Sequence, residues 1–286
     1  MEQQGQKKIN AVQTVQYDPN LYHYDKVAEG ISGGFEAVTD EHVQQFHEQG
    51  YLVINDGFSQ EEIQQALAGM AYLMDGKHPD FRGVQFEPGL GVRKSELVGE
   101  ERRGAIRKLM SYVKYESRLN AMATHPGLIA VLTRLIGETP VLFQDMALCK
   151  PPRVGSEKPW HQDCAYFNIP LGTTVAAVWI ALDEATAENG CMHVIPGSHK
   201  TPTVHFKRRD WQICDTDVAA DRDVMVPLKP GGCLFWHGLT HHGTPANLSD
   251  KGRRALQLHY KPEHHEDITT QERMEIYGSE GKDVEC

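Results

Sequence analysis

The tripeptide His161-Gln162-Asp163 places an imidazole and a carboxylate two residues apart. On a β-strand, residues i and i+2 point to the same face, so these two side chains are expected to lie side by side. This arrangement suits two neighbouring ligands of one metal ion. A second histidine from another strand would complete a two-histidine, one-carboxylate triad, which leaves coordination positions open for oxygen and a cosubstrate.

The third ligand is expected on a later strand that returns beside the first. Residues 235–260 contain four candidate histidines: His237, His241, His242 and His259. Arg253 and Arg254 lie in the same stretch. Arginine suits the distal carboxylate of a 2-oxoglutarate cosubstrate because its planar fork pairs with both oxygens. A histidine, then a turn, then an arginine at the start of the next strand would place both side chains in one cavity.

The elements that must hold these residues fall into two parts of the chain. Up to about residue 137, helices are predicted over 41–48, 61–74 and 105–137, with a strand at 51–54 and a long loop at 76–104. From residue 139 onward, short apolar or alternating runs recur between clusters of glycine, proline and asparagine. Many short strands with this punctuation predict an antiparallel sandwich or barrel.

Local signals mark the ends of the first two helices. Thr39 and Asp40 can cap the first helix, and Gly50 can end it. Ser59 is followed three residues later by Glu62, which is a capping-box pattern at the start of the second helix.

Composition narrows the class of protein. Of 286 residues, 40% are hydrophobic and 24% are charged, and the formal net charge is −10. A nucleic-acid binder is usually basic, so that partner is disfavoured. No apolar run approaches the ~18–20 residues that a membrane span needs, and the polar N-terminus predicts no secretion signal.

The chain is expected to form one main domain. We predict an N-terminal arm over 1–38 and a single domain over 39–286, with a helical part to about 137, a β-rich body at about 139–262 and a C-terminal tail. The six cysteines are scattered without a CxxC pair. A disulfide scaffold is therefore not expected, and the reducing cytoplasm is the expected compartment.

Four motifs follow one another along the chain: HQD, VWIAL, ENGCMHVIPGSHK and HG…NLSD…RRA. This ordered set resembles the phytanoyl-CoA dioxygenase family of iron(II)/2-oxoglutarate-dependent oxygenases. The resemblance spans roughly residues 39–262 and is strongest over 139–260. It implies a mainly β fold with flanking helices, the double-stranded β-helix (a cupin-like jelly roll). It also implies Fe(II), 2-oxoglutarate and O₂, with ascorbate as an auxiliary reductant.

The resemblance implies the ligand set residue by residue. His161 and Asp163 match the first two iron ligands of the family. The family's distal histidine precedes a small residue, and its cosubstrate arginine comes eleven positions later. His242, followed by Gly243, matches this spacing with Arg253, whereas the same step leads from His241 to a glycine and from His237 to a leucine. His242 is therefore preferred, with His241 in reserve.

Further residues are expected in the cosubstrate pocket. The resemblance implies Thr244 beside Arg253, Trp179 on the predicted strand at 173–182, and Lys108 reaching in from the helical part. Strand alternation puts four side chains of the run 141–150 on one face: Gln144, Met146, Leu148 and Lys150. Gln144 and Met146 are expected to line the cavity. Alternation also places His259 on the face of Arg253, as a residue of the substrate side or behind the metal ligands.

The function implied is hydroxylation of a small organic substrate, coupled to decarboxylation of 2-oxoglutarate to succinate and CO₂. The carboxylate of Asp163 argues against halogenation, because related halogenases replace it with a small residue. His193 and His199 belong to a stretch that is mainly architectural in the family. The alternatives are a non-catalytic jelly-roll protein that binds a small molecule or metal, and a metal-dependent hydrolase or isomerase.

Three loops are expected to form the pocket mouth: 76–104, 164–173 and 201–228. In the last loop, four basic side chains would favour an anionic group: His205, Lys207, Arg208 and Arg209. Four aspartates in the same loop largely offset them: Asp210, Asp215, Asp217 and Asp221.

Overall fold

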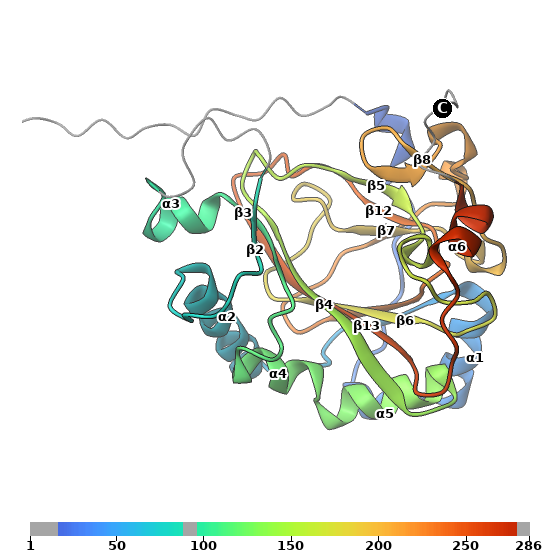
Figure 1. Ribbon diagram of the computed structural model, residues 1–286, viewed down its shortest axis with the longest axis horizontal. Helices are drawn as coiled ribbons and strands as arrows, with labels where there is room; N and C mark the ends of the chain where they lie inside the picture. The colour runs from blue at the N-terminus through green and yellow to red at the C-terminus, as the bar shows by residue number, and fades with distance from the viewer. Residues whose placement is uncertain (1–16, 88–95, 279–286) are drawn as a thin grey trace, which may run out of the picture.

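A computed structural model describes residues 17–87 and 96–278 (Figure 1). The first 16 residues of the expected arm, the middle of the loop 76–104 and the last eight residues of the chain lie outside these ranges. The helices are α1 (Asp40–Gln49), α2 (Gln60–Met74), α3 (Gly99–Gly104), α4 (Ser117–Ala123), α5 (Pro126–Ile136) and α6 (Thr270–Tyr277). Apart from α6, all of them precede the β-rich body.

Two antiparallel sheets form the body of the molecule. The major sheet has the strand order β1 (Tyr51–Ile54), β11 (Cys233–His237), β6 (Ala176–Ala181), β13 (Arg253–Pro262), β4 (Pro140–Lys150), β3 (Ile106–Met110) and β2 (Val84–Phe86). The minor sheet has the order β10 (Val224–Val226), β7 (Met192–Val194), β12 (His242–Thr244) and β5 (Lys158–His161). A hairpin of β8 (His205–Lys207) and β9 (Trp211–Ile213) stands apart from both.

The centre of the major sheet is buried on both faces, and β6 shows how its sequence allows this. Val178 and Ile180 point into a core shared with the helices, and Ala177 and Trp179 point into a core shared with the minor sheet. In Figure 1 the helices α4 and α5 lie beneath β4 and β13, and the minor sheet lies on the opposite side. The two stacked antiparallel sheets confirm the predicted jelly roll with flanking helices.

The predicted helix ends agree with the structure. The backbone N–H of Thr39 donates to Nδ1 of His42, and Gly50 closes α1 in the left-handed conformation with φ of 81°. Ser59 and Glu62 form the predicted capping box at the start of α2. These signals are local, so the sequence alone was sufficient to place them.

The prediction of a helix from residue 105 is wrong over its first third. Residues Ile106–Met110 instead form β3, which pairs with β4 in the register Lys108↔Leu148 and Leu109↔Ala147. The residue types of this segment suit a helix, but intrinsic preference is a weak prior that tertiary pairing overrides. The predicted loop 76–104 also contains regular structure. β2 pairs with β3 and so extends the edge of the same sheet, and α3 follows it.

Four buried cysteines are free: Cys149, Cys164, Cys191 and Cys233. Cys214, in contrast, is disulfide-bonded, which the scattered spacing did not predict. Among the described residues, no helix is both long enough and apolar enough to cross a membrane.

Candidate metal centre and cosubstrate pocket

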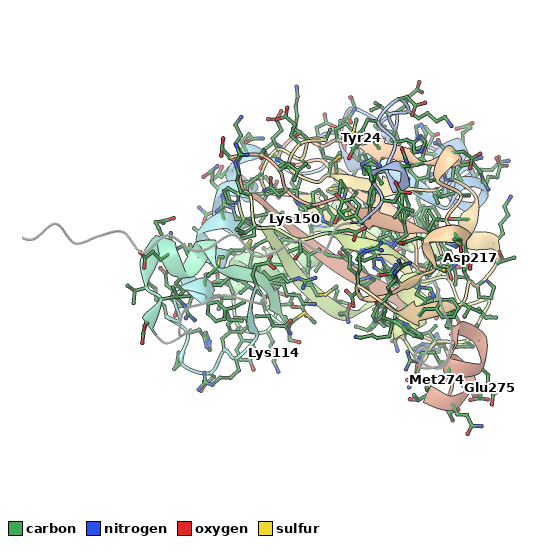
Figure 2. All side chains as sticks on the ribbon, turned by 90° about the horizontal axis from the view of Figure 1, so that it is seen from above. Tyr24, Lys114, Lys150, Asp217, Met274 and Glu275 are labelled. Carbon is green, nitrogen blue, oxygen red and sulfur yellow. The ribbon has the colours of Figure 1, made fainter. Side chains whose placement is uncertain are left out.

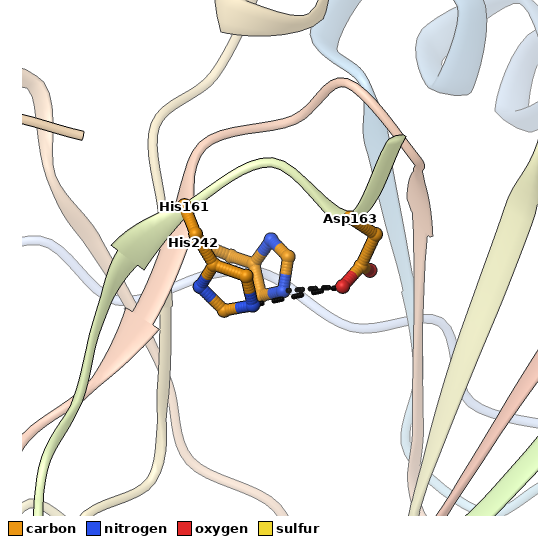
Figure 3. Close-up of side chains that lie close together, drawn as sticks. All are labelled: His161, Asp163 and His242. Atoms are coloured by element: carbon orange, nitrogen blue, oxygen red, sulfur yellow. Dashed lines mark ion pairs between the residues drawn. The ribbon is translucent and has the colours of Figure 1, made fainter. Parts of the chain in front are cut away.

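His161 and His242 lie opposite each other on neighbouring strands of the minor sheet. β5 and β12 pair antiparallel with His242 in register with His161, and the two ring centroids are 4.1 Å apart. The Nε2 atom of each ring lies 3.6 Å from Oδ1 of Asp163. Figure 3 shows both rings turned toward this carboxylate. The three side chains are buried and offer ligand atoms that all lie within 4.8 Å of one another.

Asp163 reaches this cluster from just beyond the end of β5. The strand ends at His161, and Asp163 begins a short 3₁₀ helix, Asp163–Tyr166. Gln162 between them keeps an extended backbone, with φ of −111° and ψ of 132°. Side-chain alternation therefore continues for one more residue past the strand. The predicted strand at Asp163 is wrong, but the predicted juxtaposition with His161 is present.

Backbone carbonyls fix which nitrogen of each ring is available. Nδ1 of His161 lies 2.8 Å from the carbonyl oxygen of Pro159, and Nδ1 of His242 lies 2.9 Å from that of Thr240. A carbonyl oxygen only accepts, so Nδ1 of each ring carries the hydrogen. Nε2 of each neutral ring is then free as a metal ligand, which is the orientation seen in protein metal sites.

Burial keeps both rings neutral. It lowers the pKa of His161, and it lowers the pKa of His242 to about 3. Burial by itself would raise the pKa of Asp163, but His242 and His259 beside it hold that pKa well below its ordinary value. Two neutral imidazoles and one carboxylate suit a divalent metal such as iron.

A buried cation lies in the same cavity, and no described residue forms an ion pair with it. Arg253 is 2% exposed at the start of β13, and its Nε and Nη1 have no hydrogen-bond partner among the described residues. The guanidinium lies over the ring of Trp179, 5.0 Å from the ring centroid. The Thr244 hydroxyl is also buried, and none of the described residues forms a hydrogen bond with it. Burial lowers the pKa of Arg253 to about 10.

This cradle fits a small dicarboxylate. Buried polar groups without partners are costly, so an unpaired guanidinium and hydroxyl in a cavity indicate a ligand that supplies acceptors. A carboxylate would accept hydrogen bonds from Arg253 and Thr244 together. The cavity that contains these groups also contains the three candidate metal ligands, so one molecule can reach both.

The remaining predicted pocket residues line the same cavity. Gln144 and Met146 reach it from β4, and Lys108 reaches it from β3. Lys108 is half-buried, which lowers its pKa. Lys108 was predicted on a helix, but its place on a strand paired with β4 still directs it into the cavity.

Lys150 also lines the cavity, and the sequence assigned it no role there. Lys150 is buried, and in Figure 2 it lies over the middle of the molecule, whereas Lys114 and Asp217 lie nearer the edge. Its ammonium donates to the backbone carbonyls of Thr244 and Pro245. Burial holds the pKa of Lys150 well below its ordinary value. Strand alternation placed it on the right face, but its carbonyl partners could be found only in the folded chain.

The other candidate histidines lie outside the cluster. Nε2 of His241 contacts the Thr203 hydroxyl at 2.9 Å, because neighbouring residues on a strand point in opposite directions. His237 accepts a hydrogen bond from the backbone of Leu239. Two further histidines have their own partners: His193 pairs with Asp223, and His199 contacts the backbone carbonyl of His47.

His259 lies directly behind the metal cluster. Its Nε2 is 3.0 Å from Oδ2 of Asp163, so alternation along β13 placed it correctly near the site. Trp236 donates to the same oxygen at 2.8 Å. Trp236 had not been singled out, because a tryptophan within a strand carries no signal that a carboxylate following a strand of the other sheet will face it.

Each of the three predicted mouth loops contributes to the cavity wall. Glu87 comes from the first loop, Tyr166 and Phe167 from the second, and Asp210 from the third. Asp210 pairs with Lys158 at 2.7 Å.

The basic run after residue 205 is largely neutralised. Arg209 pairs with Glu157 and Asp215, Arg208 pairs with Asp215, and His205 is buried.

Comparisons with known proteins agree with this architecture. Two solved structures share the fold: SnoK, a non-heme alpha ketoglutarate dependent carbocyclase from nogalamycin biosynthesis, and EvdO2 from Micromonospora carbonacea var. aurantiaca, complexed with 2-oxoglutarate. SnoK is 23% identical with a TM-score of 0.67, covering 84% of this chain and 90% of its own. EvdO2 is also 23% identical, with a TM-score of 0.63 and coverages of 84% and 96%.

Sequence relatives define the family. The phytanoyl-CoA dioxygenase domain-containing protein 1 of Danio rerio is 28% identical over 263 residues, covering 78% of this chain and 90% of the relative. The Rattus norvegicus protein of that name is 35% identical over 186 residues, covering 61% of this chain and 63% of its own. The family model described as Phytanoyl-CoA dioxygenase (PhyH) matches residues 46–255. The chain therefore belongs to the phytanoyl-CoA dioxygenase family.

Proposed function

We propose that the protein is an Fe(II)- and 2-oxoglutarate-dependent dioxygenase that hydroxylates a small organic substrate. The observation that carries this proposal is the pairing of two features in one cavity. One is the buried cluster of His161, Asp163 and His242, and the other is the buried guanidinium of Arg253, whose Nε and Nη1 have no partner among the described residues. Membership of the family and the 2-oxoglutarate bound to EvdO2 support the same function.

In this proposal the side chains divide the work. His161, Asp163 and His242 would hold Fe(II), which with O₂ and 2-oxoglutarate supplies the oxidising chemistry. Arg253 and Thr244 would bind the distal carboxylate of 2-oxoglutarate, and Trp179 would form the wall beneath Arg253. Lys108, Gln144 and Met146 would border the cosubstrate and the substrate. The buried walls exclude water from the reacting groups.

The cavity favours this function over a non-catalytic binding protein. A non-catalytic binder of a small molecule or a metal would not require the three ligands and the buried Arg253 together in one cavity, since a buried charge is costly. A hydrolase that uses the same ligands would likewise leave Arg253 unexplained. We also propose hydroxylation rather than halogenation, because the Asp163 carboxylate would bind the metal where a halogenase has a small residue and admits a halide.

Succinate formation tests the proposal. The purified protein is incubated with Fe(II), 2-oxoglutarate, ascorbate and air, with and without candidate substrates, and succinate is quantified. We expect succinate only when metal and 2-oxoglutarate are both present, and His242→Ala should abolish it. His241→Gln is the matched control, because His241 lies outside the cluster and glutamine can keep a contact with Thr203. Full succinate formation by His242→Ala would refute the assignment.

Product analysis shows whether the substrate is hydroxylated. Hydroxylation adds one oxygen atom to the substrate, and this atom comes from ¹⁸O₂ when labelled oxygen is supplied. Cyclisation or epimerisation, the activities named for SnoK and for the similar solved structure SnoN, leaves no such atom in the product.

We also propose that residues 39–286 act as one domain and that the protein works in the cytoplasm.

A further inference from the structure

The carboxylate of Asp163 lies between the two sheets, and each of its oxygens faces a different one. Oδ1 faces the two histidines of the minor sheet at 3.6 Å. Oδ2 faces the major sheet, where it accepts from Nε1 of Trp236 on β11 at 2.8 Å and contacts Nε2 of His259 on β13 at 3.0 Å. Trp236 and His259 are both fully buried.

The hydrogen-bond pattern fixes the tautomer of His259. An ionised carboxylate only accepts, so Nε2 of His259 carries the hydrogen that it shares with Asp163. Gln257 also contacts this Nε2, at 3.3 Å. The oxygen and nitrogen of a glutamine amide can exchange places, so Gln257 can present its oxygen to the same N–H. Oδ2 therefore receives two donors, and both of its lone-pair directions are used.

Packing holds both donors in place. The ring of His259 lies 5.1 Å from that of Phe167 and 6.0 Å from that of Phe143, and these two phenyl rings contact each other edge to face. The ring of Trp236 lies 4.9 Å from that of His242. Trp236 thus contacts two of the three side chains in the metal cluster, and neither donor can turn away without disturbing this packing.

We infer that Trp236 and His259 are positioning residues that make Asp163 a one-oxygen metal ligand. They hold Oδ2 away from the metal, so that only Oδ1 is presented beside the two histidine nitrogens. A carboxylate that bound through both oxygens would occupy a further coordination position. Holding it to one oxygen keeps that position open for cosubstrate and O₂. This inference rests on the proposed metal site and assigns two residues from the major sheet to it.

Metal affinity and the metal's spectrum test this role without relying on turnover. Trp236→Phe and His259→Phe each remove one donor while retaining an aromatic ring. Mn(II), an air-stable substitute for Fe(II), is titrated into each protein, and Co(II) absorption reports coordination number. We expect each variant to raise the Kd for Mn(II) by about 10- to 100-fold. We expect weaker Co(II) absorption, because a second carboxylate oxygen raises the coordination number.

Two further variants separate positioning from general loss of packing. His259→Gln retains an N–H donor and should restore the Kd to within about threefold of wild type. Tyr260→Phe removes a buried hydroxyl that donates to the backbone carbonyl of Ala123 in the core on the helix side, so it should lower stability without changing the Co(II) spectrum. The unfolding midpoint of each metal-free variant is measured in parallel. The two donors lie on different strands, so the two phenylalanine variants test the role independently of each other.

Unchanged Mn(II) affinity and Co(II) spectra in both phenylalanine variants would overturn the positioning role while leaving the metal site intact. A wild-type protein that binds neither metal would instead overturn the proposed function, and this inference with it. The two failures are therefore distinguishable within one set of titrations.

Discussion

The guanidinium of Arg253 shows at the scale of one residue how burial indicates a missing partner. A buried charge that lacks a counter-ion costs stability in the empty protein. Its Nε and Nη1 have no partner in the described chain, and the neighbouring Thr244 hydroxyl is in the same condition. The same groups become favourable when a carboxylate binds. This position therefore favours ligand binding and lowers the stability of the empty protein.

This reasoning predicts opposite effects for one substitution. Arg253→Leu should weaken 2-oxoglutarate binding to the Mn(II)-loaded protein by about 10- to 100-fold, since hydrogen bonds to a charged group contribute about 1.5–3 kcal/mol. The empty protein should be as stable as wild type or more stable. Calorimetric titration and urea unfolding measure the two quantities. Wild-type affinity for 2-oxoglutarate in Arg253→Leu would remove this residue from the cosubstrate site.

At the scale of elements, the pair β5 and β12 supports the metal ligands, and an N-terminal segment packs behind it. The indole of Trp160 on β5 donates to the carbonyl oxygen of Leu21, and the Tyr22 hydroxyl donates to Glu157. Gly243, next to His242, lies against this layer. A Cβ at residue 243 would lie 3.0 Å from the Tyr22 hydroxyl oxygen and 3.3 Å from the Lys158 carbonyl oxygen.

Gly243→Ala should therefore displace β12 and with it His242. We expect a loss of about 1–3 kcal/mol in the free energy of unfolding, together with weaker Mn(II) binding. Gly252→Ala is the matched control, because its Cβ would meet nothing closer than 3.6 Å. Its effect should stay within about 0.5 kcal/mol. Equal stability and equal metal affinity for the two variants would contradict the close packing at Gly243.

The elements also show where sequence reasoning succeeds and where it stops. His161 and Asp163 were placed together by backbone alternation, which held even though the strand ends between them. Alternation along β13 likewise placed His259 near the site. The strand β3 was missed because its own residue types do not indicate that it pairs with β4. Trp236 was missed because its role depends on a carboxylate brought to it by folding.

At the scale of the whole molecule, the site exists only where the two sheets face each other. The minor sheet supplies His161 and His242, and the major sheet supplies Arg253, Trp179 and the donors behind Asp163. Ligands that bind only the folded chain stabilise it by mass action, by about 2.7 kcal/mol at a concentration one hundred times the Kd. Mn(II) with 2-oxoglutarate should therefore raise the melting temperature, and His242→Ala should abolish the shift.

Buried histidines predict how the metal-free protein responds to pH. Burial lowers the pKa of His205 to about 3 and that of His241 to about 4, from an ordinary value of 6.5. Below pH 6.5 the unfolded chain takes up protons at these residues that the folded chain does not. The free energy of unfolding should therefore fall as pH decreases from 6.5 toward 4, by up to about 1.4 kcal/mol per pH unit for each histidine.

Urea unfolding in the presence of a chelator measures this slope. His205 contacts the Thr203 carbonyl oxygen through Nδ1 and receives the Gln162 backbone N–H through Nε2, so it is neutral when both bonds are made. His205→Gln should give a shallower pH dependence than wild type. A variant slope equal to that of wild type would show that His205 takes up no extra proton on unfolding.

The central claim is that one cavity binds Fe(II) and 2-oxoglutarate together. It is tested most directly by adding 2-oxoglutarate to the Fe(II)-loaded protein without oxygen and recording visible absorption, since an α-keto acid chelated to Fe(II) gives a charge-transfer band. We predict a saturable band in wild type, none in His242→Ala, and saturation at about 10- to 100-fold higher 2-oxoglutarate in Arg253→Leu. The absence of any band in the metal-loaded wild-type protein would contradict the claim.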